Sequence, residues 1–273
     1  MNRAEAVRAD VALVERGIAR SRALAQRLIT AGAVDLVDRG ETVPVFRCAQ
    51  PVLPGQELRV KASPEATFVS RGGAKLEHAL SRAGVDCSGA TVLDVGMSTG
   101  GFTDCLLHHG AARVVGIEVG HGQLDQRLAG DPRVMCFERT NVRSLSPAWF
   151  AGHGLHPAAF GLIVADLSFI STLSLLPHLA TIAAAGTTLL ALIKPQFELG
   201  PDARNARGIV RADADIDGLR QRAHDHADRA QWQPLVWFAC GLRGTDGNQE
   251  YFLAMKRRPV AGSSDFDKPE ASS

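Results

Sequence analysis

The hydrophobic positions from residue 68 onward fall into short continuous runs separated by stretches with helical spacing. Five runs have the length of buried parallel strands, two of them ending in an acid, and they cover residues 92–95, 113–118, 133–137, 161–166 and 187–193. Two further apolar runs, Trp237–Cys240 and Glu250–Met255, are separated by a polar segment and predict a hairpin. The pattern therefore predicts an α/β fold with an open, mostly parallel sheet that an antiparallel hairpin closes.

The first sixty residues follow a different pattern. Apolar positions within 11–14 suit a first helix that ends at Gly17, and Ser21 can cap a second helix. Residues 34–60 then alternate between apolar and polar as short strands do. We therefore expect a small α+β unit in front of the larger α/β domain.

The breaks between these patterns predict the domain organisation. The stretch around Pro64 is polar, and the chain after Pro259 is rich in glycine, serine and mixed charge, which is typical of disordered tails. We expect a small N-terminal domain at 1–62, a linker at 63–67, a large domain at 68–258 and a disordered tail at 259–273.

Composition places the chain among ordinary globular proteins. It has 273 residues, 45% of them hydrophobic, and a net charge of +1, so any surface for nucleic acid must be local. The five cysteines have no metal or redox spacing, which favours free thiols in a reducing cytoplasm. The start of the chain lacks the pattern of a signal peptide, and no apolar stretch is long enough to span a bilayer. We therefore expect a cytoplasmic protein with no metal site and no membrane partner.

One glycine-rich stretch, Thr91–Thr103, predicts a ligand site. It reads T-V-L-D-V-G-M-S-T-G-G-F-T, a strand followed by a tight turn and the start of a helix, where backbone N–H groups can bind a nucleotide-like ligand. The spacing matches neither the dinucleotide fingerprint nor the phosphate-binding loop of nucleotide hydrolases. Asp94 ends the strand, and a carboxylate there suits a cationic ligand such as S-adenosylmethionine. Glu118, about two dozen residues later, ends the next strand and can bind ribose hydroxyls.

Four further polar residues recur at the ends of predicted elements: Lys75, Asp166, Lys194 and Glu250. Asp166 and Lys194 end adjacent predicted strands, so both are expected to face the same crevice. Lys75 follows Gly72-Gly73, which predicts a cation at the end of a flexible turn. A lysine in such a crevice can take or share a proton. The alternative for each residue is a solvated side chain at the end of a strand or helix.

The small N-terminal unit resembles an S4 RNA-binding domain. Arg20, Arg22 and Arg27 give its second helix a positive face, and residues 1–30 contain six arginines against three acids. The resemblance is carried by Arg8-x-Asp10-x-x-Leu13, Ser21-Arg22 and Ala31-Gly32-x-Val34. Farther on, the chain has Phe46-Arg47-Cys48 where the family usually has a Lys-Pro-Ser-like step. The alternative is a solvated basic surface. The candidate RNA-binding residues are Arg8, Arg20, Ser21, Arg22, Arg27 and Arg71.

Longer motifs extend the resemblance over about residues 8–256. V-S-R-G-G-A-K-L, V-L-D-V-G-M-S-T-G-G-F-T-D, E-R-T-N-V-R, A-D-L-S-F-I-S, L-I-K-P-Q-F-E, G-I-V-R and G-N-Q-E-Y are similar to those of the TlyA family. That family joins an S4 domain to a Rossmann-like, FtsJ-like methyltransferase domain, and its members are ribosomal RNA 2′-O-methyltransferases that are also called haemolysins.

The resemblance implies roles for individual residues. It implies S-adenosylmethionine as cofactor, ribosomal RNA or an assembled ribosomal subunit as partner, and a catalytic set at Lys75, Asp166, Lys194 and Glu250. The implied cofactor contacts are Asp94, Gly96, Ser98, Gly100, Gly101, Phe102, Glu118, Asn141 and Asp166. Three other functions stay open: a non-catalytic RNA-binding assembly factor, a membrane-active haemolysin and a small-molecule methyltransferase.

Overall fold

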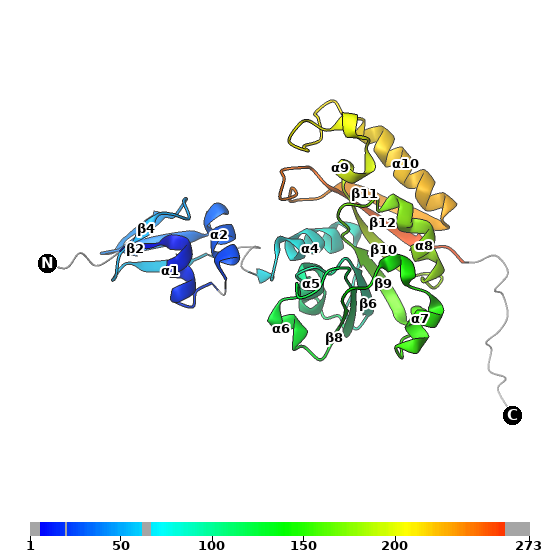
Figure 1. Cartoon of the computed structure of the whole chain (residues 1–273), viewed down its shortest axis with the longest axis horizontal. Coiled ribbons are helices and arrows are strands. Elements are labelled where there is room, and N and C mark those ends of the chain that lie inside the picture. The colour runs from blue at the N-terminus through cyan, green and yellow to red at the C-terminus, as the bar shows by residue number, and fades with distance from the viewer. Residues whose placement is uncertain (1–5, 20, 62–66, 260–273) are drawn as a thin grey trace. The chain divides into compact units, whose positions relative to one another are not determined.

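The computed structural model describes residues 6–19, 21–61 and 67–259. The chain divides into two compact units, Met1–Ala74 and Lys75–Ser273, and each contains its own strands and helices (Figure 1). Arg20, most of the expected linker at 63–67 and almost all of the expected tail at 259–273 lie outside the described residues.

The N-terminal unit is a small α+β structure. Its elements in chain order are β1 (Val7–Arg8), α1 (Ala9–Glu15), α2 (Arg22–Thr30), β2 (Val34–Asp38), β3 (Glu41–Pro44), β4 (Pro51–Val52) and β5 (Glu57–Val60). The three longer strands form an antiparallel sheet in the order β3-β2-β5, and β1 pairs with β4. The expected helix-helix-strand order is therefore confirmed.

Local sequence accounts for the two helices of this unit. Gly17, with φ +69°, follows the end of α1 in the left-handed conformation that glycine adopts most easily. The Ser21 side chain accepts a hydrogen bond of 3.2 Å from the Leu24 N–H and so caps α2. Leu24 and Leu28 on the inner face of α2 are almost completely buried. Both helix boundaries match the expectation from sequence.

The large unit contains most of α4 (Arg71–Ala83) and then alternates strands with helices. The further elements are β6 (Thr91–Val95), α5 (Gly101–His108), β7 (Arg113–Ile117), α6 (Gln126–Ala129), β8 (Val134–Phe137), α7 (Pro147–Gly152), β9 (Phe160–Ala165), α8 (Leu176–Thr181), β10 (Thr188–Ile193), α9 (Pro195–Glu198), α10 (Ile216–Arg229), β11 (Trp232–Ala239) and β12 (Tyr251–Arg257).

The seven strands form one sheet in the order β11-β12-β10-β9-β6-β7-β8. The strands from β10 to β8 are parallel, and β12 is antiparallel to both of its neighbours, so the predicted mostly parallel sheet with a closing hairpin is confirmed. Val95 lies opposite Ala165 and Ile117, and Ile193 lies opposite Tyr251. The carboxyl ends of four parallel strands and the start of β12 therefore meet at one edge, where ligands bind in open α/β sheets.

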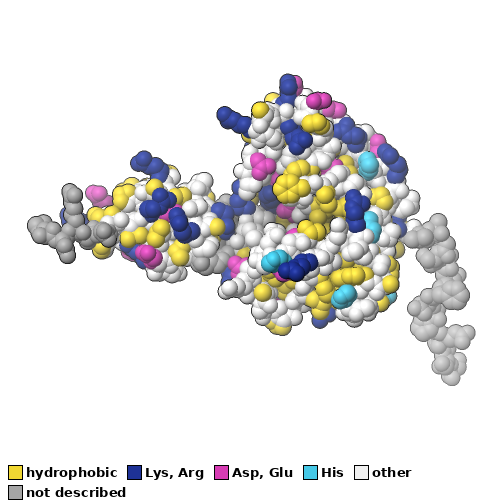
Figure 2. Space-filling view, viewed as in Figure 1, with side chains coloured by type: hydrophobic (Ala, Val, Ile, Leu, Met, Phe, Trp, Pro, Cys, Tyr) yellow, Lys and Arg dark blue, Asp and Glu magenta, His cyan; other side chains and the backbone are white. Residues whose placement is uncertain are grey.

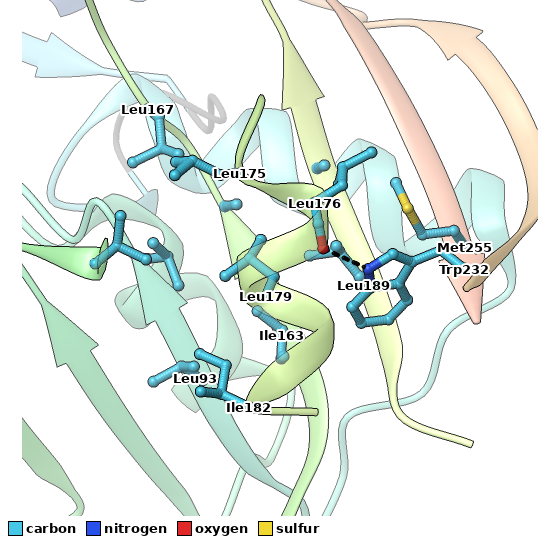
Figure 3. Close-up of a cluster of buried hydrophobic side chains, with 14 of the residues drawn as sticks. Leu93, Ile163, Leu167, Leu175, Leu176, Leu179, Ile182, Leu189, Trp232 and Met255 are labelled. Carbon is cyan, nitrogen blue, oxygen red and sulfur yellow. Dashed lines mark hydrogen bonds between the residues drawn. The ribbon is translucent and has the colours of Figure 1, made fainter. Parts of the chain in front are cut away.

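Helices cover both faces of this sheet, with α4 and α5 on one side and α7, α8 and α10 on the other (Figure 1). Strand alternation turns Leu93, Ile163 and Leu189 toward α8 and α10, where all three are completely buried. The Trp232 indole N–H donates a 3.0 Å hydrogen bond to the carbonyl of Leu176 in the same core (Figure 3). Truncating one of these side chains to alanine would cost about 2–5 kcal/mol, so this core fixes the sheet edge that carries the site.

Two expectations about local structure need correction. The expected flexible turn at Gly72-Gly73 is wrong, because α4 begins at Arg71 and both glycines lie in its first turn. A Cβ atom on Gly73 would come within 2.3 Å of the buried Phe68 ring, so this glycine serves close packing. The closing strands are also longer than predicted, since β11 begins at Trp232.

The remaining expectations concern the state of the cysteines and membrane-spanning segments. All five cysteines are free; three of them are buried, whereas Cys48 and Cys136 are only half-buried. Within the described ranges, no helix combines the length and the apolar content that a bilayer-spanning helix needs.

Candidate active site

A cavity of about 460 Å³ opens at the carboxyl edge of the sheet. Its walls come from the turn after β6, the loops after β7 and β8, and the loop after β9. This volume falls in the range of small-molecule and cofactor sites. Of the predicted cofactor residues, the walls include Gly96, Ser98, Glu118, Asn141 and Asp166.

Gly96 allows the turn after β6 to pack closely against the loop after β9. Its φ is +86°, and a Cβ atom there would come within 2.3 Å of the Asp166 carbonyl oxygen. A larger residue would therefore strain the backbone and push Asp166 away from the cavity. The glycine thus holds two walls of the cavity together.

Glu118 is a buried carboxylate held by backbone donors. The Ser98 N–H donates to its Oε2 at 2.8 Å, and the Gly120 N–H donates to its Oε1 at 2.7 Å. The residue is only 8% exposed. Because a carboxylate has about four acceptor sites, this one is oriented by two bonds and can still accept hydroxyl groups such as those of a ribose.

Asp94, at the end of β6, lies outside the cavity wall. It is completely buried, and the Thr103 hydroxyl donates to its Oδ2 at 2.7 Å. Burial raises the pKa of Asp94 to about 7, and the hydrogen bond from Thr103 only partly opposes that shift. Strand alternation turns the Asp94 side chain toward α5, where its bond with Thr103 links the end of β6 to that helix.

Three other predicted cofactor residues are also absent from the cavity wall: Gly100, Gly101 and Phe102. Gly100 has φ +87° and precedes α5, and a Cβ atom on it would meet the side chains of Leu124 and Leu128. The Phe102 ring is buried and stacks on Phe252 at 6.3 Å. Gly100 and Phe102 thus take part in packing around α5, and the predicted cofactor contacts of all three residues remain predictions.

Two lysine–carboxylate ion pairs lie at the same edge of the sheet. The Lys194 ammonium lies 2.6 Å from Asp166 Oδ1 and donates to the Ser168 hydroxyl at 2.9 Å. The Lys75 ammonium, from α4, lies 2.5 Å from Glu250 Oε2. Both lysine side chains are 10% exposed. All four predicted catalytic residues are therefore brought into ion pairs, two by two.

The two ion pairs lie close to each other. Lys194 and Glu250 flank the paired residues Ile193 and Tyr251 of adjacent strands. The buried thiol of Cys240 is influenced electrostatically by Lys75, Glu250 and Asp166, although burial is the main cause of its raised pKa. Charges from both ion pairs therefore influence the same thiol, and the two pairs form one charged cluster.

Two residues that the sequence reasoning missed hold this cluster in place. Ser168 accepts the hydrogen bond from Lys194, and its position two residues after Asp166 could have indicated that role. Glu198, at the end of α9, accepts from the Ser171 hydroxyl at 2.6 Å and from the Thr172 N–H at 2.7 Å. Glu198 thereby anchors the loop after β9, and its place at the end of the motif L-I-K-P-Q-F-E was the signal that could have indicated it.

Two of the predicted RNA-binding residues of the N-terminal unit, Arg8 and Arg22, pair with Asp10. This buried carboxylate accepts from Arg8 at 2.9 Å and from Arg22 at 3.1 Å. The hydrogen bond from Arg8 holds the pKa of Asp10 far below its usual range. Arg27 lies in the last turn of α2 and Arg71 begins α4, whereas Arg20 is outside the described residues.

Comparison with known proteins identifies the family of the large unit. The sequence profile of the FtsJ-like methyltransferases matches residues 68–257, more than half of the chain. The chain belongs to the FtsJ-like methyltransferase family. This methyltransferase is 40% identical over 258 residues to a Mycobacterium tuberculosis protein named 16S/23S rRNA (cytidine-2′-O)-methyltransferase TlyA, covering 93% of this chain and 91% of the relative.

Two further relatives match the methyltransferase over both of its units. A Brachyspira hyodysenteriae protein named hemolysin A is 32% identical, covering 90% of this chain and 98% of the relative. A solved structure of a provisionally named hemolysin from Streptococcus thermophilus is 32% identical, with a TM-score of 0.70, over 93% of this chain and 90% of that one. The resemblance to the TlyA family is thereby confirmed.

Family membership supports S-adenosylmethionine as the cofactor of this methyltransferase. The cavity fits it, because Glu118 offers an oriented carboxylate for ribose hydroxyls and Asp166 offers a second carboxylate for a cationic group. Asp94 Oδ1, just beneath the turn, is buried and has no hydrogen-bond partner among the described residues.

Proposed function

We propose that this methyltransferase methylates a ribose 2′-hydroxyl of ribosomal RNA and that Lys75, Asp166, Lys194 and Glu250 are its catalytic residues. The observation that carries the proposal is the ion pair between the buried Lys194 and Asp166, since Asp166 also lines the cavity. Asp166 therefore connects Lys194 to the cavity that is proposed to hold the cofactor. The names of the relatives supply the substrate class.

Each side chain has a chemical role in the proposed reaction. A ribose 2′-hydroxyl is a poor nucleophile, so Lys194 in its neutral amine form accepts or shares the hydroxyl proton, and Asp166 and Ser168 hold the ammonium that this transfer forms. The bound cofactor supplies a methyl group on a cationic sulfur. Lys75, fixed by Glu250, positions the hydroxyl or a neighbouring phosphate, and in-line placement of the reactants supplies much of the rate.

The proposed partner is ribosomal RNA, either free or in an assembled subunit, and the proposed location is the cytoplasm. The arginines held by Asp10 in the N-terminal unit suit the phosphate backbone. A non-catalytic assembly factor would need these arginines but not a buried lysine–carboxylate cluster, so the cluster favours the enzyme.

The proposal is tested on purified ribosomal subunits from cells that lack the protein. Full-length protein and S-adenosylmethionine should introduce a 2′-O-methyl mark that mass mapping of the RNA locates, and calorimetry should show cofactor binding. Lys194→Ala is the control, because it should bind cofactor but leave the RNA unmarked. A protein that binds no cofactor at millimolar concentration, or that lyses red cells at low concentration without marking RNA, would contradict the proposal.

A further inference from the structure

The N-terminal unit exposes one aromatic ring to solvent. Phe46 is 71% exposed, the highest value for a large hydrophobic side chain among the described residues of that unit. It follows β3 and precedes Arg47, which is also exposed. Single exposed hydrophobic residues are common, so the surroundings of Phe46 decide whether the ring has a role.

The backbone on both sides of Phe46 is anchored, so the ring is held outward. Val45 is completely buried, and its N–H donates to the Val34 carbonyl at 2.8 Å. After Phe46, the Cys48 carbonyl accepts from the Asp10 N–H at 3.2 Å. Because the backbone is tied to the core at Val45 and again at Cys48, this loop holds Phe46 at the surface of the unit.

Cations lie beside this loop. Arg8 and Arg22 share the buried Asp10, with 49% and 58% of their side chains exposed. The Cys48 carbonyl accepts from the Asp10 N–H, and Arg8 pairs with Pro51, so the loop that carries Phe46 borders the arginine pair. Hydrophobic and basic side chains lie next to one another on the visible face of this unit (Figure 2). Three arginines against one aspartate give this surface a net positive charge.

We propose that Phe46, together with Arg8, Arg22 and Arg47, binds an unpaired RNA nucleobase and its adjacent phosphates. The inference rests on the proposed function, which makes RNA the partner, and it adds which part of an RNA this surface selects. Every nucleobase has a π-face that can stack on an aromatic ring, whereas paired bases inside a duplex are already stacked. A rigid exposed ring beside fixed guanidinium groups therefore favours loops and bulges over continuous duplex.

The test measures binding of the full-length protein to two RNAs with equal numbers of phosphates, a hairpin with a single-stranded loop and a blunt duplex. Phe46→Ala should weaken hairpin binding about 5- to 150-fold, the range of one base stacked on an aromatic side chain. Duplex binding and the salt dependence of hairpin binding should stay unchanged, because no phosphate contact is lost. Phe46→Trp should restore hairpin binding.

Val43→Ala is the matched control, since Val43 is 52% exposed on the neighbouring strand and should leave both affinities unchanged. The proposal is overturned if Phe46→Ala binds the hairpin as tightly as the wild type, if both RNAs lose affinity equally, or if the wild type does not bind the hairpin. It is also overturned if Phe46→Ala weakens binding only to intact ribosomal subunits, because the ring would then contact a protein. Cofactor-dependent methylation by the wild type is scored separately, so its absence points to the proposed function instead.

Discussion

The two units of this chain hold their cations in opposite ways. In the N-terminal unit, one buried carboxylate, Asp10, holds two arginines whose side chains are about half exposed. In the large unit, Lys75 and Lys194 are each paired with one carboxylate and are almost completely buried. Arginines held at a surface present charge to a large anion, whereas buried lysines have weak solvation and can take part in proton transfer. In the proposed function, the exposed arginines therefore serve RNA binding and the buried lysines serve the reaction.

Two completely buried aspartates show the same contrast. Guanidinium donors keep the pKa of Asp10 low, so it stays ionised and orients the arginines. Among the residues that the structure describes, Asp94 has one hydroxyl donor and no cationic partner, so burial raises its pKa to about 7. Burial alone therefore does not set the charge of a carboxyl group; the groups that face it do.

The largest effect is expected at Lys194. Lys194→Ala should lower methylation of ribosomal subunits about 10²- to 10⁴-fold, because the proton acceptor is lost. Cofactor affinity measured by calorimetry should stay within a few-fold, since the substitution trims a side chain at the cavity edge. Lys194→Arg sharpens the comparison with the N-terminal unit, because arginine keeps the charge but does not release a proton. Substantial rescue by arginine would mean that Lys194 acts only as a charge.

Asp94 should make stability depend on pH in one direction. Its folded pKa of about 7 lies above the usual value of 3.8, so its neutral form stabilises the fold at low pH. That stability is lost as pH rises from about 4 through 7, at most about 4 kcal/mol on the scale of 1.36 kcal/mol per pKa unit. Urea unfolding at several pH values should show this fall in the wild type and a smaller fall in Asp94→Asn. Identical pH profiles would contradict a raised pKa.

Asp10 should make stability depend on pH in the opposite direction to Asp94. Its folded pKa is depressed, so its stabilising effect is present above the unfolded value of 3.8 and is lost as pH falls below it. Asp10→Asn should therefore destabilise the N-terminal unit at neutral pH, by about 1–3 kcal/mol for the loss of charge-assisted hydrogen bonds, and less in acid. Unfolding followed by hydrogen exchange in that unit measures the effect. An equal loss of unfolding free energy at neutral and acidic pH would contradict a depressed pKa of Asp10.

The smallest effect is expected at Arg22, which is exposed and is proposed to serve RNA affinity only. Arg22→Ala should weaken RNA binding a few-fold and reduce the slope of log affinity against log salt by about one, because one phosphate contact is lost. Cofactor affinity should not change. Equilibrium binding at three salt concentrations gives the slope, and an unchanged slope would mean that Arg22 does not contact phosphate.

Much of the fold follows from local pattern. The five apolar runs became parallel strands because each is long and continuous enough to be buried on both faces, and Ser21 and Gly17 formed the expected helix boundaries. The start of α4 was missed because two glycines normally indicate a turn. Gly73 is helical because the Phe68 ring occupies the space that a side chain would need, and that contact depends on folding.

The candidate site was only partly readable from the chain. The residue types and their places at the ends of strands were evident, because a parallel sheet brings carboxyl ends to one edge. The pairing of Lys75 with Glu250 joins α4 to β12, 175 residues apart, and only the packed sheet decides it. The same applies to Asp94. Its place in the glycine-rich motif predicted a ligand contact, whereas in the structure its side chain faces Thr103 and is absent from the cavity wall. Sequence by itself determined which chemical groups are available at the edge of the sheet, because backbone periodicity is local. The tertiary structure decided which groups share a proton, a charge or a cavity, because those energies depend on distances across the fold.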